Sequence, residues 1–181
     1  MRHPEGFRYT EEFISPKEET DLLDHIRGQP LREAEYKQYT AKRRILSFGS
    51  EYDFSSNELL PGPQLPQFLL PLRKKVAAWI DVPEKKFAHA LLTHYPSGTA
   101  LGWHRDVPNF EIIVGVSLLG PCRMRFRPYP ATKGSRGQLA IELVPRSAYV
   151  LQGDVRWHWQ HSIPATPGER YSVTFRSLRG R

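Results

Sequence analysis

The sequence predicts a mainly β protein with flanking helices, an α+β fold whose core is a β-sandwich or a jelly roll. From residue 87 onward, the chain consists of short runs that are rich in β-branched and aromatic residues. Proline and glycine separate these runs, which is typical of turns between short strands. No helical pattern alternates with the runs, and this disfavours a parallel sheet.

A first helix is expected near the N-terminus. Ser15 has the position of an N-cap, Pro16 occupies the first helical position, and Glu18 completes a capping box. The helix is expected to end at about Arg27, because Gly28 follows and glycine commonly terminates helices.

A second helix is expected over Pro66–Ile80, where apolar residues recur at helical spacing. Between the two helices, Arg43–Tyr52 is expected to form a hairpin. The strands expected after residue 87 are Ala88–Tyr95, Glu111–Leu119, Arg123–Arg127, Gln138–Leu143, Ala148–Gln152 and Arg170–Ser177. The sequence contains no long linker, so we expect a single domain over residues 1–181.

The composition favours a folded protein with a polyanionic partner. The 181 residues include 26 lysines and arginines against 19 acidic residues, which gives a formal net charge of +7. A basic surface attracts polyanions, although it is also a common means of keeping a protein soluble. The single cysteine, Cys122, excludes a secreted disulfide framework. No apolar segment of 18 residues occurs, so we expect a soluble, cytoplasmic monomer that does not enter a membrane.

Two histidines and an aspartate form a candidate metal site. Strand alternation places His104 and Asp106 on one face, so that an imidazole and a carboxylate could share one metal ion. A surface histidine beside a solvated aspartate is the alternative for this pair alone. His161 favours the metal site over this alternative, because two histidines and one carboxylate form the facial triad of non-haem Fe(II) oxygenases. His158 is the nearest rival of His161 as a ligand.

The last expected strand carries two arginines on one face. Alternation places Arg170, Ser172, Thr174 and Arg176 on the same side. Two guanidinium groups are costly to bury without partners, so an inward-facing row implies an anionic ligand. A small dicarboxylate would suit, because arginine binds a carboxylate through two parallel hydrogen bonds. The alternative is an edge strand that holds both arginines in water.

In their order and spacing, these motifs resemble the AlkB family of Fe(II)/2-oxoglutarate-dependent dioxygenases, in the form of a bacterial-type AlkB homologue. The resemblance extends from about Lys42 to Arg179. Besides His104-x-Asp106, His161 and Arg170-x5-Arg176, the matching segments are Arg43-Arg44-Ile45-Leu46-Ser47-Phe48-Gly49, Tyr52-Asp53-Phe54 and Tyr95-Pro96-Ser97-Gly98.

The resemblance implies a double-stranded β-helix, which is a jelly roll, with Fe(II) held by His104, Asp106 and His161. Residues 87–181 would form this core. Residues 1–86 would provide helical support and a segment for substrate recognition. The implied reaction couples decarboxylation of 2-oxoglutarate to succinate and CO2 with O2-dependent hydroxylation of an N-alkyl group, which then leaves as formaldehyde.

The co-substrate residues are also taken from the resemblance. Arg170 would pair with the distal carboxylate of 2-oxoglutarate, helped by the Tyr95 hydroxyl, and Arg176 would lie near the carboxylate at the metal. The chain departs from the family pattern at two of these positions. Ser172 replaces the usual Asn, and Arg-x-Ser pairs serve the same purpose in other 2-oxoglutarate oxygenases. Thr93 replaces another common Asn as a shorter partner for the co-substrate.

Alkylated bases in DNA or RNA are the implied substrates, and the identity of the base stays open. Several nucleobase demethylases carry a second acid shortly after the metal-binding aspartate. This chain has Val107-Pro108-Asn109 there, and Glu111 is the first acid available. We therefore expect loose discrimination among bases.

Aromatic and basic residues are candidates for substrate contacts. Trp103 is expected in the pocket wall, and Phe48 and Tyr52 are expected to stack on an extruded base. Arg43 and Arg44 are expected to bind phosphates. Two other function classes stay open: a hydroxylase or demethylase that acts on protein or a small molecule, and a nucleic-acid-binding module with an inactive metal site.

Overall fold

The structure is a computed structural model that describes residues 3–36, 39–53, 55–130 and 139–180, with side chains left out over residues 35–41. The described strands are β1 (Phe7–Thr10), β2 (Arg32–Tyr36), β3 (Tyr39–Phe48), β4 (Ser50–Asp53), β5 (Glu58–Pro61), β6 (His89–Tyr95), β7 (Leu101–His104), β8 (Phe110–Leu118), β9 (Cys122–Pro128), β10 (Leu139–Leu143), β11 (Ala148–Leu151), β12 (Trp159–Ile163) and β13 (Arg170–Leu178). The helices are α1 (Pro16–Arg27), α2 (Leu70–Trp79) and α3 (Gly153–Trp157), with short 3-10 turns at Gln67–Leu69 and Glu84–Lys86.

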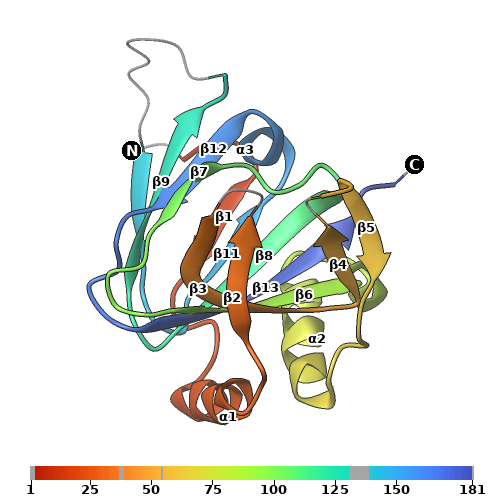
Figure 1. Ribbon diagram of the computed structural model, residues 1–181, viewed down its shortest axis with the longest axis vertical. Helices are drawn as coiled ribbons and strands as arrows, with labels where there is room; N and C mark the ends of the chain where they lie inside the picture. The colour runs from red at the N-terminus through yellow and green to blue at the C-terminus, as the bar shows by residue number, and fades with distance from the viewer. Residues whose placement is uncertain (1–2, 37–38, 54, 131–138, 181) are drawn as a thin grey trace.

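Two antiparallel sheets face each other (Figure 1). The larger has seven strands in the order β1-β11-β8-β13-β6-β3-β2, and the smaller has four in the order β10-β9-β12-β7. A separate two-stranded ribbon consists of β4 and β5. The predicted jelly-roll fold with flanking helices is therefore confirmed.

The two longer helices cover the outer face of the seven-stranded sheet, at the bottom of the view in Figure 1. The predicted capping box of α1 is present, because Ser15 Oγ accepts from the Glu18 N–H at 3.1 Å and the Ser15 N–H donates to Glu18 Oε2 at 2.7 Å. Leu23 and Val76 from the two helices belong to one apolar cluster with Leu92 of β6. A second apolar cluster fills one end of the space between the sheets, where Phe126 of β9 is buried.

The structure corrects two predictions about the N-terminal part. Arg43–Tyr52 is not a hairpin, because β3 pairs with β2 and β6 while β4 pairs with β5. Between β3 and β4, Gly49 has φ +81°, and a Cβ there would lie 1.8 Å from the carbonyl oxygen of Ala88. The first 86 residues are also not only helical support, since β1, β2 and β3 are strands of the seven-stranded sheet.

Five of the described strands along the chain were not among the strands expected from the sequence, namely β1, β2, β5, β7 and β12. Gln138, the first residue of one predicted strand, lies outside the described residues. In the part of the chain that the structure describes, no helix has the length and apolar character needed to cross a membrane.

Candidate active site

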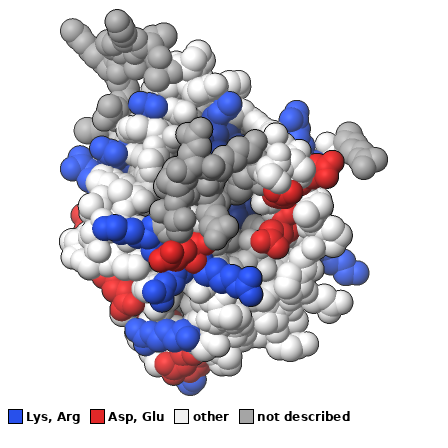
Figure 2. Space-filling view, in the orientation of Figure 1, with Lys and Arg blue, Asp and Glu red and all other residues white. Residues whose placement is uncertain are grey.

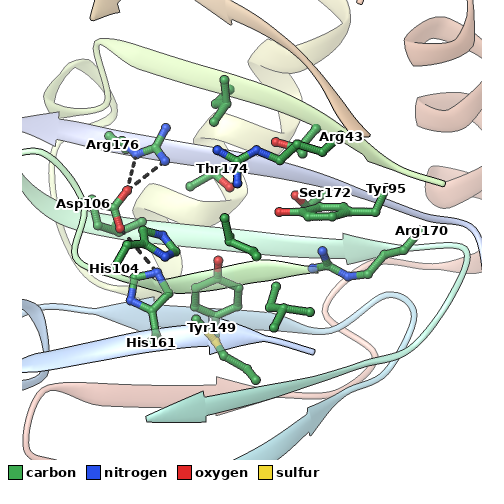
Figure 3. Close-up of a pocket in the computed structure, with 16 residues that line it drawn as sticks. Arg43, Tyr95, His104, Asp106, Tyr149, His161, Arg170, Ser172, Thr174 and Arg176 are labelled. Carbon is green, nitrogen blue, oxygen red and sulfur yellow. Dashed lines mark hydrogen bonds and ion pairs between the residues drawn. The ribbon is translucent and has the colours of Figure 1, made fainter. Parts of the chain in front are cut away.

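A pocket with many polar side chains lies between the two sheets and borders the second apolar cluster, whose Ile113, Met124 and Ile163 are part of the pocket lining. The prediction that four side chains of β13 share one face is confirmed, because this pocket is bordered by Arg170, Ser172, Thr174 and Arg176. Figure 3 shows two groups of side chains at opposite ends of this pocket. His104, Asp106, His161 and Arg176 form one group, and Arg170, Ser172 and Tyr95 form the other.

The candidate metal ligands converge because of strand pairing. His161 on β12 and His104 on β7 are direct cross-strand neighbours on the inner face of the four-stranded sheet. Their ring centroids are 4.2 Å apart. Asp106 follows β7 by two residues and stays on the same side, with its Oδ2 3.6 Å from His161 Nε2. One possible ligand atom from each residue lies within 4.8 Å of the other two, so this group could hold a metal ion. His158, the rival ligand, is exposed and contacts Asp154.

The protonation states suit a cation at this place. Burial lowers the pKa of His104 and lowers that of His161 to about 3, so both imidazoles are neutral at pH 7. His104 Nδ1–H donates to the Gly102 carbonyl at 2.8 Å, which leaves the lone pair of Nε2 for a metal. Burial alone would raise the pKa of Asp106, but Arg176, together with the two imidazoles, holds that pKa well below its usual range.

Arg176 forms the buried ion pair of the site. Its Nε and Nη2 donate to Asp106 Oδ1 at 2.9 and 2.8 Å. The side chains of Arg176 and Asp106 are only 14% and 7% exposed. Arg176 therefore neutralises and orients the carboxylate from the seven-stranded sheet.

At the opposite end of the pocket, Arg170 has a free hydrogen-bond donor. Its residue is 1% exposed, and its Nε donates to Ser117 Oγ at 3.0 Å. Arg170 Nη1 is buried and has no hydrogen-bond partner among the described residues. The guanidinium carbon lies 4.9 Å from the centroid of the Tyr95 ring. A buried arginine with an unused N–H facing a polar pocket fits the carboxylate of a small anion.

Ser172 and Thr93 lie beside this arginine. They are cross-strand neighbours on β13 and β6, and both border the pocket. Each hydroxyl supplies one donor and can accept as well, so the replacement of asparagine at these positions keeps hydrogen-bonding groups next to Arg170.

Sequence reasoning did not identify Tyr149 of β11, which lies between the two groups in Figure 3. The residue is 9% exposed, and burial raises the pKa of its phenol, so the hydroxyl is protonated at neutral pH. Gly115 on the neighbouring strand β8 makes room for the ring, because a Cβ there would lie 2.3 Å from Tyr149 Cζ. The pairing of β11 with β8 could not be read from the sequence.

Sequence reasoning also missed Arg156 of α3, which is 3% exposed. Its Nη2 donates to the carbonyls of Val107 and Phe110, both at 2.7 Å, and its Nε donates to Phe110 as well. The loop that follows Asp106 is thus tied to the helix that precedes β12 and His161. Arg156 links the two chain segments that carry the candidate ligands.

The structure does not bring the predicted substrate-binding residues together at one place. Arg43 borders the pocket, and burial lowers the pKa of its guanidinium, whereas Arg44 is exposed on the opposite face of β3. Phe48 is 6% exposed within the apolar cluster under the helices, and Tyr52 lies on the β4–β5 ribbon. Trp103 is not in the pocket wall. Strand alternation turns it to the outer face of the four-stranded sheet, because its neighbour His104 points inward.

The chain is similar to known proteins in sequence and in fold. A family model described as the 2OG-Fe(II) oxygenase superfamily matches residues 6–176. The alkylated DNA repair protein ALKBH8 homolog of Arabidopsis thaliana is 27% identical over 175 residues, which are 84% of this chain and 49% of that protein. The chain thus spans about half the length of the plant relative.

Two further proteins are similar to this chain, one in sequence and one in fold. The probable RNA/DNA demethylase ALKBH6 of Danio rerio is 26% identical over 175 residues, covering 88% of this chain and 70% of that protein. The solved structure of OsALKBH1 superposes with a TM-score of 0.77 over 98% of this chain and 99% of its own, and its 13% identity shows a shared fold. The predicted relationship to AlkB-type dioxygenases is confirmed. The chain belongs to the 2OG-Fe(II) oxygenase superfamily, whose cofactors are Fe(II), 2-oxoglutarate and O2.

Proposed function

We propose that this chain removes alkyl groups oxidatively from nucleobases in DNA or RNA. The observation that carries the proposal is the pocket itself, in which a two-histidine, one-carboxylate group and a buried arginine with a free N–H lie at opposite ends. A metal at the first group and a dicarboxylate reaching the second would leave the pocket mouth for a substrate.

His104, Asp106 and His161 would hold Fe(II). The neutral imidazoles and the ionised carboxylate have the protonation states that metal binding requires. Three protein ligands leave open positions for the co-substrate and O2. Arg176 keeps Asp106 oriented before the metal arrives.

Arg170 would bind the distal carboxylate of 2-oxoglutarate. Ser117 fixes the direction of its Nε, and the free Nη1 is the donor that a carboxylate would satisfy. Tyr95, Ser172 and Thr93 would contribute hydroxyl groups around the same carboxylate. When bound, the metal and 2-oxoglutarate together supply the oxidation of a C–H bond of the substrate.

Three observations support a nucleic-acid substrate. The formal net charge of +7 supplies attraction to phosphates without regard to sequence. Relatives with 26% and 27% identity are described as a probable RNA/DNA demethylase and an alkylated DNA repair protein homolog. Arg43 adds a cation to the wall of the pocket itself.

The test is a panel of single- and double-stranded DNA and RNA oligonucleotides that carry N-methyl or etheno adducts, incubated with Fe(II), 2-oxoglutarate and O2. Mass spectrometry of the oligonucleotide and quantification of succinate measure the two halves of the reaction. We expect loss of the alkyl group matched by succinate. The Asp106→Ala variant is the negative control, and it should form neither product.

A peptide and small-molecule panel run in parallel distinguishes the alternative hydroxylase. Succinate that rises with a peptide, with no repair of any modified oligonucleotide, would replace the proposed substrate class. An Asp106→Ala variant that still decarboxylates 2-oxoglutarate at the parent rate would contradict the metal assignment.

A further inference from the structure

Arginine and aromatic side chains alternate across the outer face of the four-stranded sheet. The guanidinium carbons of Arg125 and Arg127 on β9 lie 5.0 and 4.5 Å from the centroid of the Trp103 ring on β7. The guanidinium carbon of Arg105 lies 3.9 Å from the centroid of the Tyr129 ring. Both sets of contacts bridge β12, which lies between β7 and β9. We call these five residues the outer strip.

The outer strip carries positive charge that the described protein does not neutralise. Arg125 Nε donates to Ser162 Oγ at 3.0 Å, and Arg127 Nε donates to Gln160 Oε1 at 2.8 Å. Ser162 and Ala140 are the cross-strand neighbours of Arg125, and Gln160 is the neighbour of Arg127 on β12. No carboxylate among the described residues forms an ion pair with either arginine. Their terminal nitrogens therefore remain available to an external anion.

Acidic residues lie near the ends of the outer strip. Glu142 is the cross-strand neighbour of Arg123, one position beyond Arg125 on the same face of β9. Asp154 accepts hydrogen bonds from His158 and Trp159. On the face shown in Figure 2, acidic and basic side chains are intermixed. The net charge alone therefore does not define a track for a polyanion, whereas the middle of the outer strip is locally basic.

The spacing of the strip suits a nucleic-acid strand. Two residues along a β-strand are about 6.6 Å apart, which is close to the separation of consecutive phosphates in an extended strand. Tyr129 is 42% exposed, so part of its ring is open to a base. Basic side chains interleaved with aromatic rings bind single-stranded nucleic acids through phosphate contacts and base stacking.

We propose that the outer strip binds single-stranded nucleic acid. Arg125 and Arg127 would contact successive phosphates, and Tyr129 would stack on a base. This inference rests on the proposed function in one respect, because it assigns the bound strand as the part of the substrate that flanks the reacting nucleotide.

The outer strip and the candidate metal ligands lie on opposite faces of the same strands. Trp103 precedes His104, and Gln160 and Ser162 flank His161, so alternation sends the candidate ligands inward and the strip residues outward. β7 is the edge strand of its sheet. A nucleic-acid strand that extends from the outer strip to the pocket would pass over this edge.

The test is binding of an unmodified, fluorescently labelled single-stranded oligonucleotide of about 16 nucleotides, long enough for one such site, followed by anisotropy over a range of salt concentrations. The double variant Arg125→Gln/Arg127→Gln should reduce the slope of log K against log salt by about 1.4, which corresponds to two lost phosphate contacts. The matched control is Lys85→Gln/Lys86→Gln. It removes two exposed charges from the turn after α2 and should keep the parent slope.

A second variant keeps the proposal testable if the arginine pair proves necessary for folding. Tyr129→Leu retains every charge and should weaken binding at least about five-fold with an unchanged salt slope. Before binding is compared, the melting temperature of each variant is measured and shown to equal that of the parent. If the arginine variant keeps the parent's slope of log K against log salt, or if the lysine control loses as much slope, the proposal that the outer strip binds nucleic acid is wrong.

Because this assay uses an unmodified strand and no turnover, its result is separate from the proposed reaction. Normal binding with no dealkylation of any oligonucleotide would overturn the proposed function and leave the outer strip standing. Dealkylation of an oligonucleotide, with binding that the substitutions in the outer strip do not change, would support the proposed function and contradict the role of the outer strip.

Discussion

The two arginines of β13 have opposite electrostatic surroundings. Arg176 pairs with Asp106 at 2.8 Å, whereas Arg170 has a hydroxyl partner and an unused Nη1. Removing one member of a buried ion pair leaves the other charge uncompensated, while removing an unpaired buried charge relieves a desolvation penalty. We therefore expect the loss of Arg170 to cost the ligand-free protein little stability, in contrast to the loss of Arg176.

We predict that Arg170→Met leaves the unfolding free energy of the metal-free protein unchanged or raises it by about 1 kcal/mol. The same change should weaken 2-oxoglutarate binding on the order of 100-fold, because charged hydrogen bonds are lost. Denaturant titration measures the first quantity, and calorimetric titration of 2-oxoglutarate in the presence of Mn(II) measures the second. Parent-like affinity for 2-oxoglutarate would move the anchoring role to another residue.

Arg176→Met should behave in the opposite way. It leaves Asp106 buried without a cation, so the unfolding free energy of the metal-free protein should fall by about 3 kcal/mol. Mn(II) should recover part of this loss, because the ion replaces the missing positive charge. A denaturant titration with and without Mn(II) tests both statements. A loss that Mn(II) does not reduce would argue against a metal at Asp106.

At the scale of elements, the site depends on a clamp between a short helix and a loop. Arg156 of α3 donates hydrogen bonds to the carbonyls of Val107 and Phe110, which are neutral acceptors. Such contacts behind a metal site set the positions of the ligands. Asp106 precedes this loop and His161 follows the helix, so the clamp limits how far the two ligands can separate.

We predict that Arg156→Leu lowers the affinity for Mn(II) by roughly 10- to 100-fold. Titration of Mn(II), followed by electron paramagnetic resonance, measures this directly and does not depend on turnover. Arg179→Gln is the matched control, because Arg156 and Arg179 lie 4.3 and 4.8 Å from the centroid of the same Trp157 ring. Equal effects of the two substitutions would indicate that packing on Trp157, rather than the clamp, matters.

These elements also show what the sequence could predict. The capping box of α1 and the alternating face of β13 follow from local rules, and both were predicted correctly. Tyr149 and Ser117 reach the site through the order of strands in the larger sheet, and Arg156 reaches it through the packing of α3 against the loop after Asp106. No local sequence pattern contains either arrangement. Trp103 was assigned to the wrong face, although the same alternation that turns His104 inward would have placed it correctly.

At the scale of the whole molecule, each sheet supplies one half of the site. The candidate metal ligands belong to β7, β12 and the loop after β7, on the side of the smaller sheet. The candidate anion-binding residues Tyr95, Arg170 and Ser172 belong to β6 and β13 of the larger sheet. Helices α1 and α2 and the main apolar cluster lie on the other face of that larger sheet, and their side chains do not line the pocket. A ligand that touches both groups would therefore hold the two sheets together.

We predict that the thermal stability gained from Mn(II) and 2-oxoglutarate together exceeds the sum of the gains from each alone. At about 100 times the dissociation constant, a ligand that binds only the folded state contributes about 2.7 kcal/mol. In a chain of this length, that corresponds to a rise in Tm of roughly 5 to 10 °C. 2-Oxoglutarate without metal should give a much smaller rise, because Arg170 would anchor only its distal end. The measurement is a matrix of melting curves over both concentrations, repeated with Asp106→Asn, in which the synergy should vanish. Additive shifts in the parent would mean that the metal and the anion bind independently, and the two ends of the pocket would then not serve one bridging ligand.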